Sequence, residues 1–353
     1  MNIYYVAAIW LGMALLASVV SIRIAVPAAL VEIVIGALAG NIPGIQEHVT
    51  STDVVTFLAS LGSLVLTFLA GAEIDPVSLR RHWKASMSIG LVSFALPFLV
   101  AFGFCGLVLG WALGGLFASY GWLLLVFVIV AAGSVALLPW LVRLAITHLG
   151  HRVSEPEIKL LLVVLFGLGG LATQAGSEAV LPAYVAGLVV AGVFLHDRVL
   201  MDRLRSIAFA ILTPFFFLRA GTLISASALI TGAGIIGALL LVKLAAKMIG
   251  VWPVAAAFRL PPRERTYTTL LMATGLTFGS IAALFGLTHQ LITKTQYTEL
   301  VTVVILSAFV PTLIAQQLFQ PAVVNAEEEE ALGEEDLTII HGPGAGRRSR
   351  QQY

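Results

Sequence analysis

Long apolar stretches, separated by short polar connections, run through the first 320 residues of the chain. Most of them approach or exceed the ~18–20 residues that an α-helix needs to cross a bilayer. The pattern therefore predicts about eleven membrane-spanning helices. Their approximate ranges are 3–21, 24–41, 54–72, 85–111, 120–142, 158–174, 179–196, 206–223, 227–250, 266–288 and 299–319.

Residues 266–288 have spanning length but a poor sequence for a continuous helix. Gly275, Thr277, Gly279 and Ser280 lie in the middle, and glycine costs ~1 kcal/mol relative to alanine inside a helix. Many secondary transporters hold an ion or substrate between the ends of such broken helices at the membrane midplane. A second interpretation is that the glycines only let another helix approach closely.

The composition sets the class of protein. Hydrophobic residues make up 59% of the chain and charged residues 11%, with a mean hydropathy of +0.99. This predicts an all-α polytopic membrane protein, since ten-residue segments of alternating hydrophobicity are missing. The single cysteine, Cys105, excludes a disulfide framework. Phosphate-binding loops, metal-ligand clusters and nucleophile–base pairs are also missing, so we expect no enzyme, no cofactor, no metal site and no nucleic-acid partner.

The basic residues gather on one side of the predicted topology. Those that follow the odd-numbered spans are Arg23, Arg80, Arg81, Lys84, Arg143, Arg152, Lys159, Arg198, Arg203, Arg205, Arg259, Arg263 and Arg265. The opposite connections hold only Lys294. The positive-inside rule then places the N-terminus outside and the C-terminus in the cytoplasm, in a plasma (inner) membrane. After a membrane domain over 1–325, the acidic residues 326–353 predict a disordered cytoplasmic tail.

Ionisable residues inside spans are candidates for function because each costs roughly 2.5–3.5 kcal/mol at a helix centre. Lys243 and Lys247 lie one helical turn apart and suit proton exchange, although Lys247 could also extend to the cytoplasmic edge. Arg219 lies near the outer end of its span, where it could anchor two domains or only reach the outer headgroups, and the sequence favours a structural role. Glu178 lies at a helix start, where the dipole explains a carboxylate. Glu32 is deeper and is the stronger acidic candidate for function, although it could also pair with a polar neighbour.

Several longer runs, taken in their order along the chain, resemble a known family. They are IRIAVPAALVEIVIGALAGN, FLASLGSLVLTFLAGAEIDPVSLRR, RVSEPEIKLLLVVLFGLGGLATQAGSEAVLPAYVAGLVVAG, SIAFAILTPFFFLRAGTLIS, VKLAAKMIGVWP and GLTFGSIAALFGLTHQLITKTQYTELVTVVILSAFVPTLIAQ. Together they resemble sodium/hydrogen exchangers of the monovalent cation:proton antiporter-2 family, over nearly all of residues 1–320.

The resemblance implies a dimer-forming panel domain and a moving core. The panel corresponds to about 1–84 and 145–225, the core to about 85–112 and 227–320, and a linker helix to about 120–142. In the family two broken helices cross in the core, and a carboxylate on the next helix binds Na⁺ or K⁺ and H⁺ alternately. The crossing would include Gly275, Thr277, Gly279 and Ser280. Lys247, or else Lys243, would be the lysine that pairs with the carboxylate in some members.

The chain departs from this family pattern around Gly110–Ala118. There the fourth span runs directly into what resembles the family's seventh helix, so the fifth helix and most of the sixth are missing. No acidic residue occurs between Asp75 and Glu155, so the cation-binding aspartate is missing as well.

Three functions follow from this pattern. The first is a cation:proton antiporter that works by alternating access and is transport-deficient unless a partner protomer supplies the missing elements. The second is a non-transporting homodimer or regulatory membrane protein on the same scaffold. The third is an anion or organic-acid carrier that uses Lys243, Lys247 and Arg219.

Overall fold

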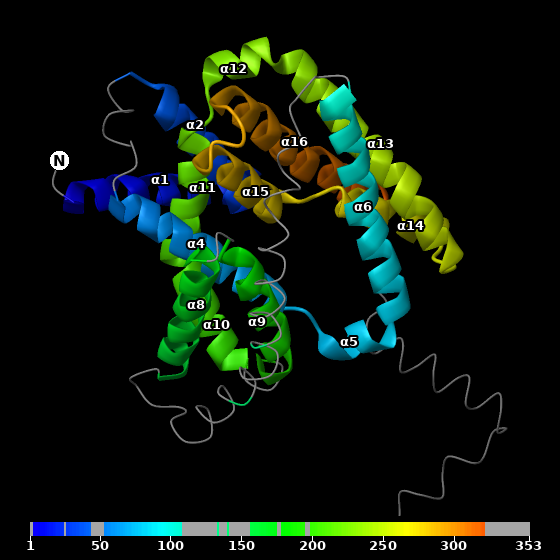
Figure 1. Ribbon diagram of the computed structural model, residues 1–353, viewed down its shortest axis with the longest axis horizontal. Coiled ribbons are helices and arrows are strands. Elements are labelled where there is room, and N and C mark those ends of the chain that lie inside the picture. Colours follow the sequence, from blue (N-terminus) through cyan, green and yellow to red (C-terminus); the bar gives the residue numbers. More distant parts are fainter. Residues whose placement is uncertain are drawn as a thin grey trace, which may run out of the picture.

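A computed structural model describes residues 3–24, 26–43, 53–107, 133, 140, 156–174, 178–194 and 198–321. Its elements are α1 (Ile3–Ile24), α2 (Ala28–Asn41), α4 (Asp53–Ala72), α5 (Pro76–Arg81), α6 (Trp83–Leu107), α8 (Pro156–Gln174), α9 (Val180–Phe194), α10 (Arg198–Ile207), the π-helix η1 (Ala208–Leu212), α11 (Thr213–Thr222), α12 (Ala226–Thr231), α13 (Ala233–Ala257), α14 (Pro262–Met272), α15 (Leu276–Thr288) and α16 (Lys294–Leu318). All elements of this part of the chain are helices (Figure 1).

The helices follow the apolar stretches of the sequence. Eight described helices or helix pairs are long and apolar enough to cross a membrane, and two shorter apolar helices, Ala28–Asn41 and Val180–Gly192, accompany them. Each predicted span coincides with one of these, except 120–142, of which only residues 133 and 140 are described. The multi-pass, all-helical class is confirmed, while the total number of spans stays a prediction. The predicted tail, 326–353, also lies outside the described residues.

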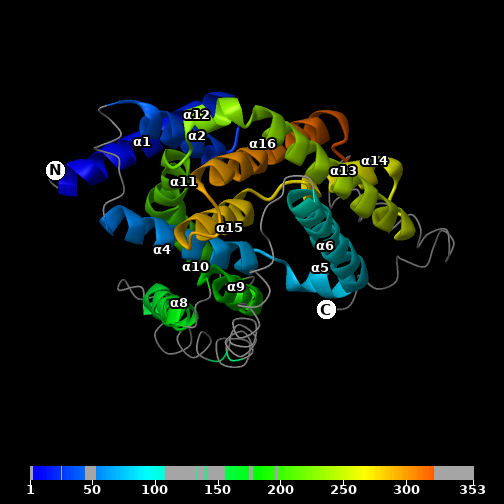
Figure 2. The ribbon, with the colours of Figure 1, turned by 45° about the horizontal axis from the view of Figure 1, so that its top comes forward.

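The helices pack into two groups. In the first, α2 and α4 pack against α11, α4 also packs against α9, and α1 covers α2. In the second, α13 packs against α6, α14 and α16. Figures 1 and 2 show the first group on the left and α5, α6, α13 and α14 on the right, with α15 and α16 between them. A shared apolar cluster joins the two groups, with Ile33 and Phe216 from the first and Ile281 and Tyr297 from the second.

Glycine allows the closest helix contacts in the first group. A Cβ atom at Gly221 would collide with the carbonyl oxygen of Ile33, and one at Gly187 with the carbonyl oxygen of Phe68. A Cβ atom at Gly71 would lie 2.8 Å from the backbone nitrogen of Leu188. Such contacts bring helix backbones together in membranes, where burial of apolar surface adds little to association. The short distances between α2 and α11 and between α4 and α9 therefore require glycine at these contact positions.

A proline explains the π-helix in the span that includes α10 and α11. Pro214 has no N–H group, so it leaves the carbonyl of Ala210 without its usual helical partner. The backbone N–H of Thr213 donates to Ala208, one residue further back than in an α-helix. This widened turn lets the helix continue to Thr222.

Asn41 joins the end of α2 to the connection between α11 and α12. Its Nδ2 donates to the carbonyl oxygens of Ala37 and Ile224, both at 2.7 Å, and its Oδ1 accepts from the backbone N–H of Ala226 at 2.9 Å. From the other side, Thr298 Oγ1 of α16 accepts from the backbone N–H of Ser225 at 3.1 Å. The corner over 223–225 is therefore held by both helix groups.

Replacing Asn41 by alanine should lower the free energy of unfolding by about 1–3 kcal/mol, because the part-buried carbonyl of Ile224 loses its donor and the exposed N–H of Ala226 loses its acceptor. The measurement is the thermal unfolding of the detergent-solubilised protein. Ser227→Ala is the control, because its side chain bonds only to the exposed Ser225 hydroxyl among the described residues. Equal unfolding temperatures of the two variants would contradict this role of Asn41.

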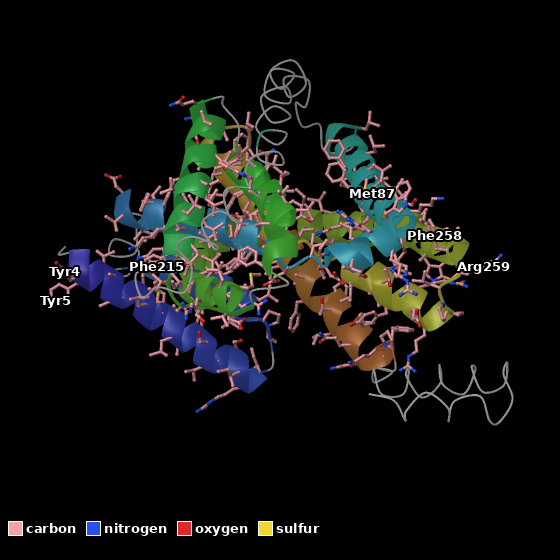
Figure 3. All side chains as sticks on the ribbon, turned by 90° about the horizontal axis from the view of Figure 1, so that it is seen from below. Tyr4, Tyr5, Met87, Phe215, Phe258 and Arg259 are labelled. Atoms are coloured by element: carbon pink, nitrogen blue, oxygen red, sulfur yellow. The ribbon has the colours of Figure 1, made fainter. Side chains whose placement is uncertain are left out.

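Large apolar side chains cover the outside of the described helices, as expected for surfaces that face lipid. Tyr4 and Tyr5 of α1 are 79% and 67% exposed, and Met87 of α6 is 63% exposed. Figure 3 shows the two tyrosines at one end of the molecule and Met87, Phe258 and Arg259 at the other.

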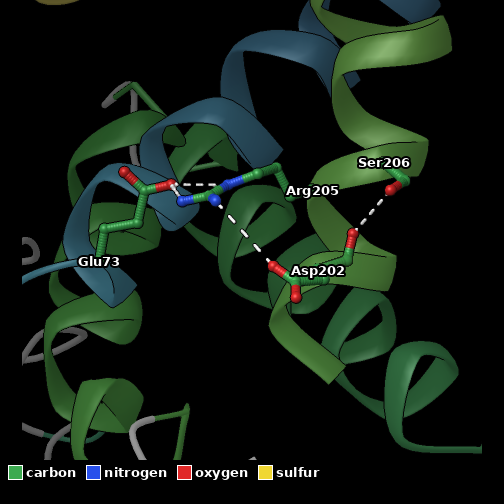
Figure 4. A network of polar contacts seen from close by, with 4 residues as sticks. All are labelled: Glu73, Asp202, Arg205 and Ser206. Carbon is green, nitrogen blue, oxygen red and sulfur yellow. Dashed lines mark hydrogen bonds and ion pairs between the residues drawn. The ribbon is translucent and has the colours of Figure 1, made fainter. Parts of the chain in front are cut away.

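A surface ion pair joins α4 to α10. Arg205 Nη2 lies 2.5 Å from Glu73 Oε1, and Arg205 Nη1 lies 4.0 Å from Asp202 Oδ1 (Figure 4). The side chains of Arg205 and Glu73 are 47% and 43% exposed, so this pair adds little to stability. It does bring together two chain segments for which the charge pattern predicts the same side of the membrane.

Candidate functional site

The predicted broken helix is present between α14 and α15. The helix ends at Met272 and resumes at Leu276. Between them Ala273 and Thr274 turn back with backbone bonds to Leu270 and Leu271. The backbone N–H groups of the first turn of α15 have no partners in a preceding turn, and the carbonyls at the end of α14 are met only by this tight turn. Opposite partial charges therefore face each other inside a stretch of spanning length.

The break lies slightly earlier than the sequence indicates. Gly275 forms its edge, whereas Thr277, Gly279 and Ser280 lie within the first turns of α15. Ser280 is fully buried, and its hydroxyl donates to the carbonyl of Leu276 at 2.7 Å. A Cβ atom at Gly279 would lie 2.6 Å from Val304 of α16. Gly279 thus serves helix packing, and the chain breaks at Gly275, so the stretch is both interrupted and closely packed.

Lys243 and Lys247 of α13 each reach a serine on a neighbouring helix. Lys243 Nζ donates to Ser307 Oγ of α16 at 2.6 Å. Lys247 Nζ donates to Ser93 Oγ of α6 at 2.5 Å, and also to the Ser93 carbonyl. Both serines are buried, and all three helices are 25 residues long with these side chains near their middles. The structure thus places the lysines in a polar cluster inside the second group.

Close packing of α6 against α13 creates this contact. A Cβ atom at Gly250 would lie 2.9 Å from Val92 and 2.7 Å from Leu96. Because Gly250 has no side chain, the segment of α6 that contains Ser93 can approach Lys247. Ser93 and Ser307 are not among the candidates that the sequence singles out. The one feature of the sequence that could have indicated them is a hydroxyl residue in the middle of an apolar stretch. Many spanning helices contain such a residue, so this feature is not specific.

Arg219 of α11 lies apart from the two lysines, at the junction of the two groups. Its Nε atom is buried and makes no hydrogen bond within the described part of the chain. It interacts electrostatically with Tyr297 of α16, whose buried hydroxyl donates to the carbonyl of Ala220 at 2.8 Å. This position fits the anchoring role that the sequence favours for Arg219.

The acidic candidates are separated from the lysine cluster. Glu32 of α2 is 4% exposed, and its Oε2 makes no hydrogen bond to any described residue. Glu178 precedes α9, and burial raises its pKa, although nearby His289 and the backbone N–H of Ala179 oppose the rise. Glu299 of α16, which sequence analysis overlooked, is buried against Gly232.

The arrangement supplies proton and hydrogen-bond donors rather than cation ligands. Neither Lys243 nor Lys247 forms an ion pair with a carboxylate of the described residues. In the same part of the chain, no group of His, Cys, Asp and Glu side chains gathers where it could hold a metal ion. Thr277, Gly275 and the ends of α14 and α15 lie together at the break.

Several known cation antiporters are similar to this chain. The chain is similar to cation/H(+) antiporter 18 of Arabidopsis thaliana, with 24% identity over 377 residues that cover 84% of this chain and 46% of the relative. It is similar to the Na(+)/H(+)-K(+) antiporter GerN of Bacillus cereus, with 22% identity over 357 residues that cover 84% and 90%. It is also similar to the glutathione-regulated potassium-efflux system protein KefC of Cronobacter sakazakii, with 22% identity over 404 residues that cover 95% and 64%.

Two features of these matches bear on the organisation of the chain. The chain spans about half the length of the plant relative. The match with KefC is 404 residues long but covers only 95% of the 353 residues here, so roughly seventy aligned positions of KefC have no counterpart in this chain. The transmembrane region of sodium/hydrogen exchangers matches residues 11–119 and 107–320, in two segments that meet at 107–119. Together these segments cover most of the chain, which therefore belongs to the sodium/hydrogen exchanger family.

Proposed function

We propose that this chain has the scaffold of a Na⁺ or K⁺:proton antiporter but does not exchange these cations, because the helix with the cation-binding aspartate is missing. The observation that carries this proposal is the sequence between Asp75 and Glu155, which has no acidic residue. The longer match with KefC and the two family segments that meet at 107–119 support the loss of residues near Gly110–Ala118.

The geometry of the break supports the same conclusion. In this family two broken helices cross, and their opposed ends surround the ion. The α14–α15 break would supply one half of that pair, with Gly275 and Thr277 at the crossing. The second broken helix and the acid would belong to the missing stretch. Lys243 and Lys247 then have serine partners where the family would provide a carboxylate.

The two helix groups suggest how the scaffold is divided. The group around α1, α2, α4, α9 and α11 corresponds to the panel, and the group around α6 and α13–α16 to the remaining core. The predicted linker over 120–142 would join them. We place the chain in the plasma (inner) membrane with its N-terminus outside and its C-terminus in the cytoplasm, as the charge pattern predicts.

The proposal predicts that everted membrane vesicles with this chain show no Na⁺- or K⁺-driven proton efflux above that of empty vesicles. The measurement is the recovery of fluorescence of a pH-sensitive dye after salt addition. GerN of Bacillus cereus, measured in parallel at matched protein content, controls for vesicle quality. Robust cation-driven recovery with this chain would refute the proposal.

The second candidate is a non-transporting homodimer. The packing of α2 on α11 and of α4 on α9 favours it, because this group is held by its own backbone contacts and does not depend on the missing stretch. Crosslinking that traps a dimer in vesicles without cation-driven flux would favour this candidate. A monomer would exclude it.

A further inference from the structure

Lys243, Lys247 and Ser93 form a cluster in which donors outnumber acceptors. An ammonium group has three N–H donors and no acceptor. Among the described residues, Lys243 Nζ makes one hydrogen bond, to Ser307 Oγ at 2.6 Å. Lys247 Nζ makes two, both to Ser93. Both ammonium groups therefore keep donors that no described residue satisfies.

The serines differ in what they can still donate. The Ser307 hydroxyl accepts from Lys243 and donates its own proton to the carbonyl of Val304 at 2.9 Å. It therefore has no donor left for another ligand. The Ser93 hydroxyl accepts from Lys247, and its proton has no acceptor among the described residues. The free groups of the cluster are thus N–H and O–H donors on α13 and α6, and they suit an anion rather than a cation.

Charge leads to the same conclusion. Two ammonium groups in the interior of a helix bundle repel each other, and a buried charge without a partner is strongly unfavourable. Arg219 does not join them, because α11 packs on α2 and α4, whereas α13 packs on α6, α14 and α16. A small anion between the two amines would provide the missing counter-charge.

We propose that Lys243, Lys247 and Ser93 bind a monovalent inorganic anion of the chloride class. The inference rests on the proposed function in one respect, since the missing carboxylate would otherwise neutralise the amines. A monovalent ion is favoured because the surroundings are apolar and removing it from water costs less than removing a divalent ion. Leu96, Ile236 and Leu239 provide apolar surface on the same helices.

The test is thermal unfolding of the purified full chain in detergent, in sodium chloride and in sodium gluconate at equal ionic strength. Chloride should raise the unfolding temperature in a saturable manner. In Lys243→Met and in Lys247→Met the apparent affinity for chloride should fall about tenfold or more, because each loses a charge-assisted hydrogen bond. Lys294→Met, at an exposed position at the start of α16, is the matched control and should respond as the unmodified chain does.

Equal unfolding temperatures in the two salts would overturn the proposal, and so would the same chloride response in Lys243→Met and Lys294→Met. If the methionine variants do not purify, binding of radioactive chloride to the unmodified chain decides. Competition by nitrate but not by gluconate supports a monovalent site, whereas no binding, or stronger competition by phosphate, refutes it. Cation-driven flux would refute the proposed function without changing these readouts, so the two failures are distinguishable.

Discussion

Gly187→Ala is expected to lower the free energy of unfolding by about 3 kcal/mol or more and to remove most of the monodisperse protein after purification. The added methyl group would overlap the carbonyl oxygen of Phe68 and lie 2.9 Å from the backbone nitrogen of Ala72. Both atoms belong to α4, so no side chain can rotate away and the two helices must separate. Overpacking of this kind usually costs about 1–3 kcal/mol and more where backbone must move.

Gly170→Ala is the matched control. Gly170 lies on α8 with nothing within 4 Å of the position of a new Cβ atom. Alanine is the better helix former, so this variant should be neutral or more stable by up to about 1 kcal/mol. Size-exclusion profiles and unfolding temperatures in detergent compare the two. If both variants behave alike, α4 and α9 are not as close as described.

Ser93→Ala is expected to cost about 2–3 kcal/mol, because it removes the hydroxyl that accepts from the Lys247 ammonium at 2.5 Å and leaves that charge with fewer partners. The effect should depend on the lysine. In a Lys247→Met background the same substitution should cost less than about 1 kcal/mol, since no charge then remains to be satisfied. Unfolding is measured in gluconate, so that no chloride contributes.

Ser60→Ala controls for the loss of a hydroxyl. Ser60 is exposed on α4, and its side chain donates only to Thr56 of its own helix, so its substitution should change stability by less than about 0.5 kcal/mol. If Ser93→Ala and Lys247→Met add independently, the described hydrogen bond does not contribute to stability.

Local sequence signals were sufficient to predict the helices and to predict that residues 266–288 are interrupted. Apolar length predicted each described span, because lipid allows few alternatives to a helix. Glycine and hydroxyl residues predicted the interruption in 266–288, but its position depends on which glycine α16 contacts. Gly279 packs against Val304 and stays helical, while the chain opens at Gly275.

The partners of the charged residues could not be predicted in the same way. Ser93 lies 154 positions before Lys247, and Ser307 lies 64 positions after Lys243. Nothing in either serine's neighbourhood distinguishes it from other hydroxyls in spans. The two lysines share a helix face in the sequence, yet each donates to a different helix, Lys243 to α16 and Lys247 to α6. The three bonds of Asn41 likewise depend on tertiary packing, which brings α2 to a corner more than 180 residues away.

The doubly held corner over 223–225 limits where this protein can bend. Asn41 ties it to α2 and Thr298 ties it to α16, so α12 cannot swing freely at its start. The first joint beyond these ties is Gly232, which ends α12 and begins α13. The buried Glu299 of α16 lies directly against Gly232, and α12 itself packs on α16. The short α12 is therefore braced at both of its ends.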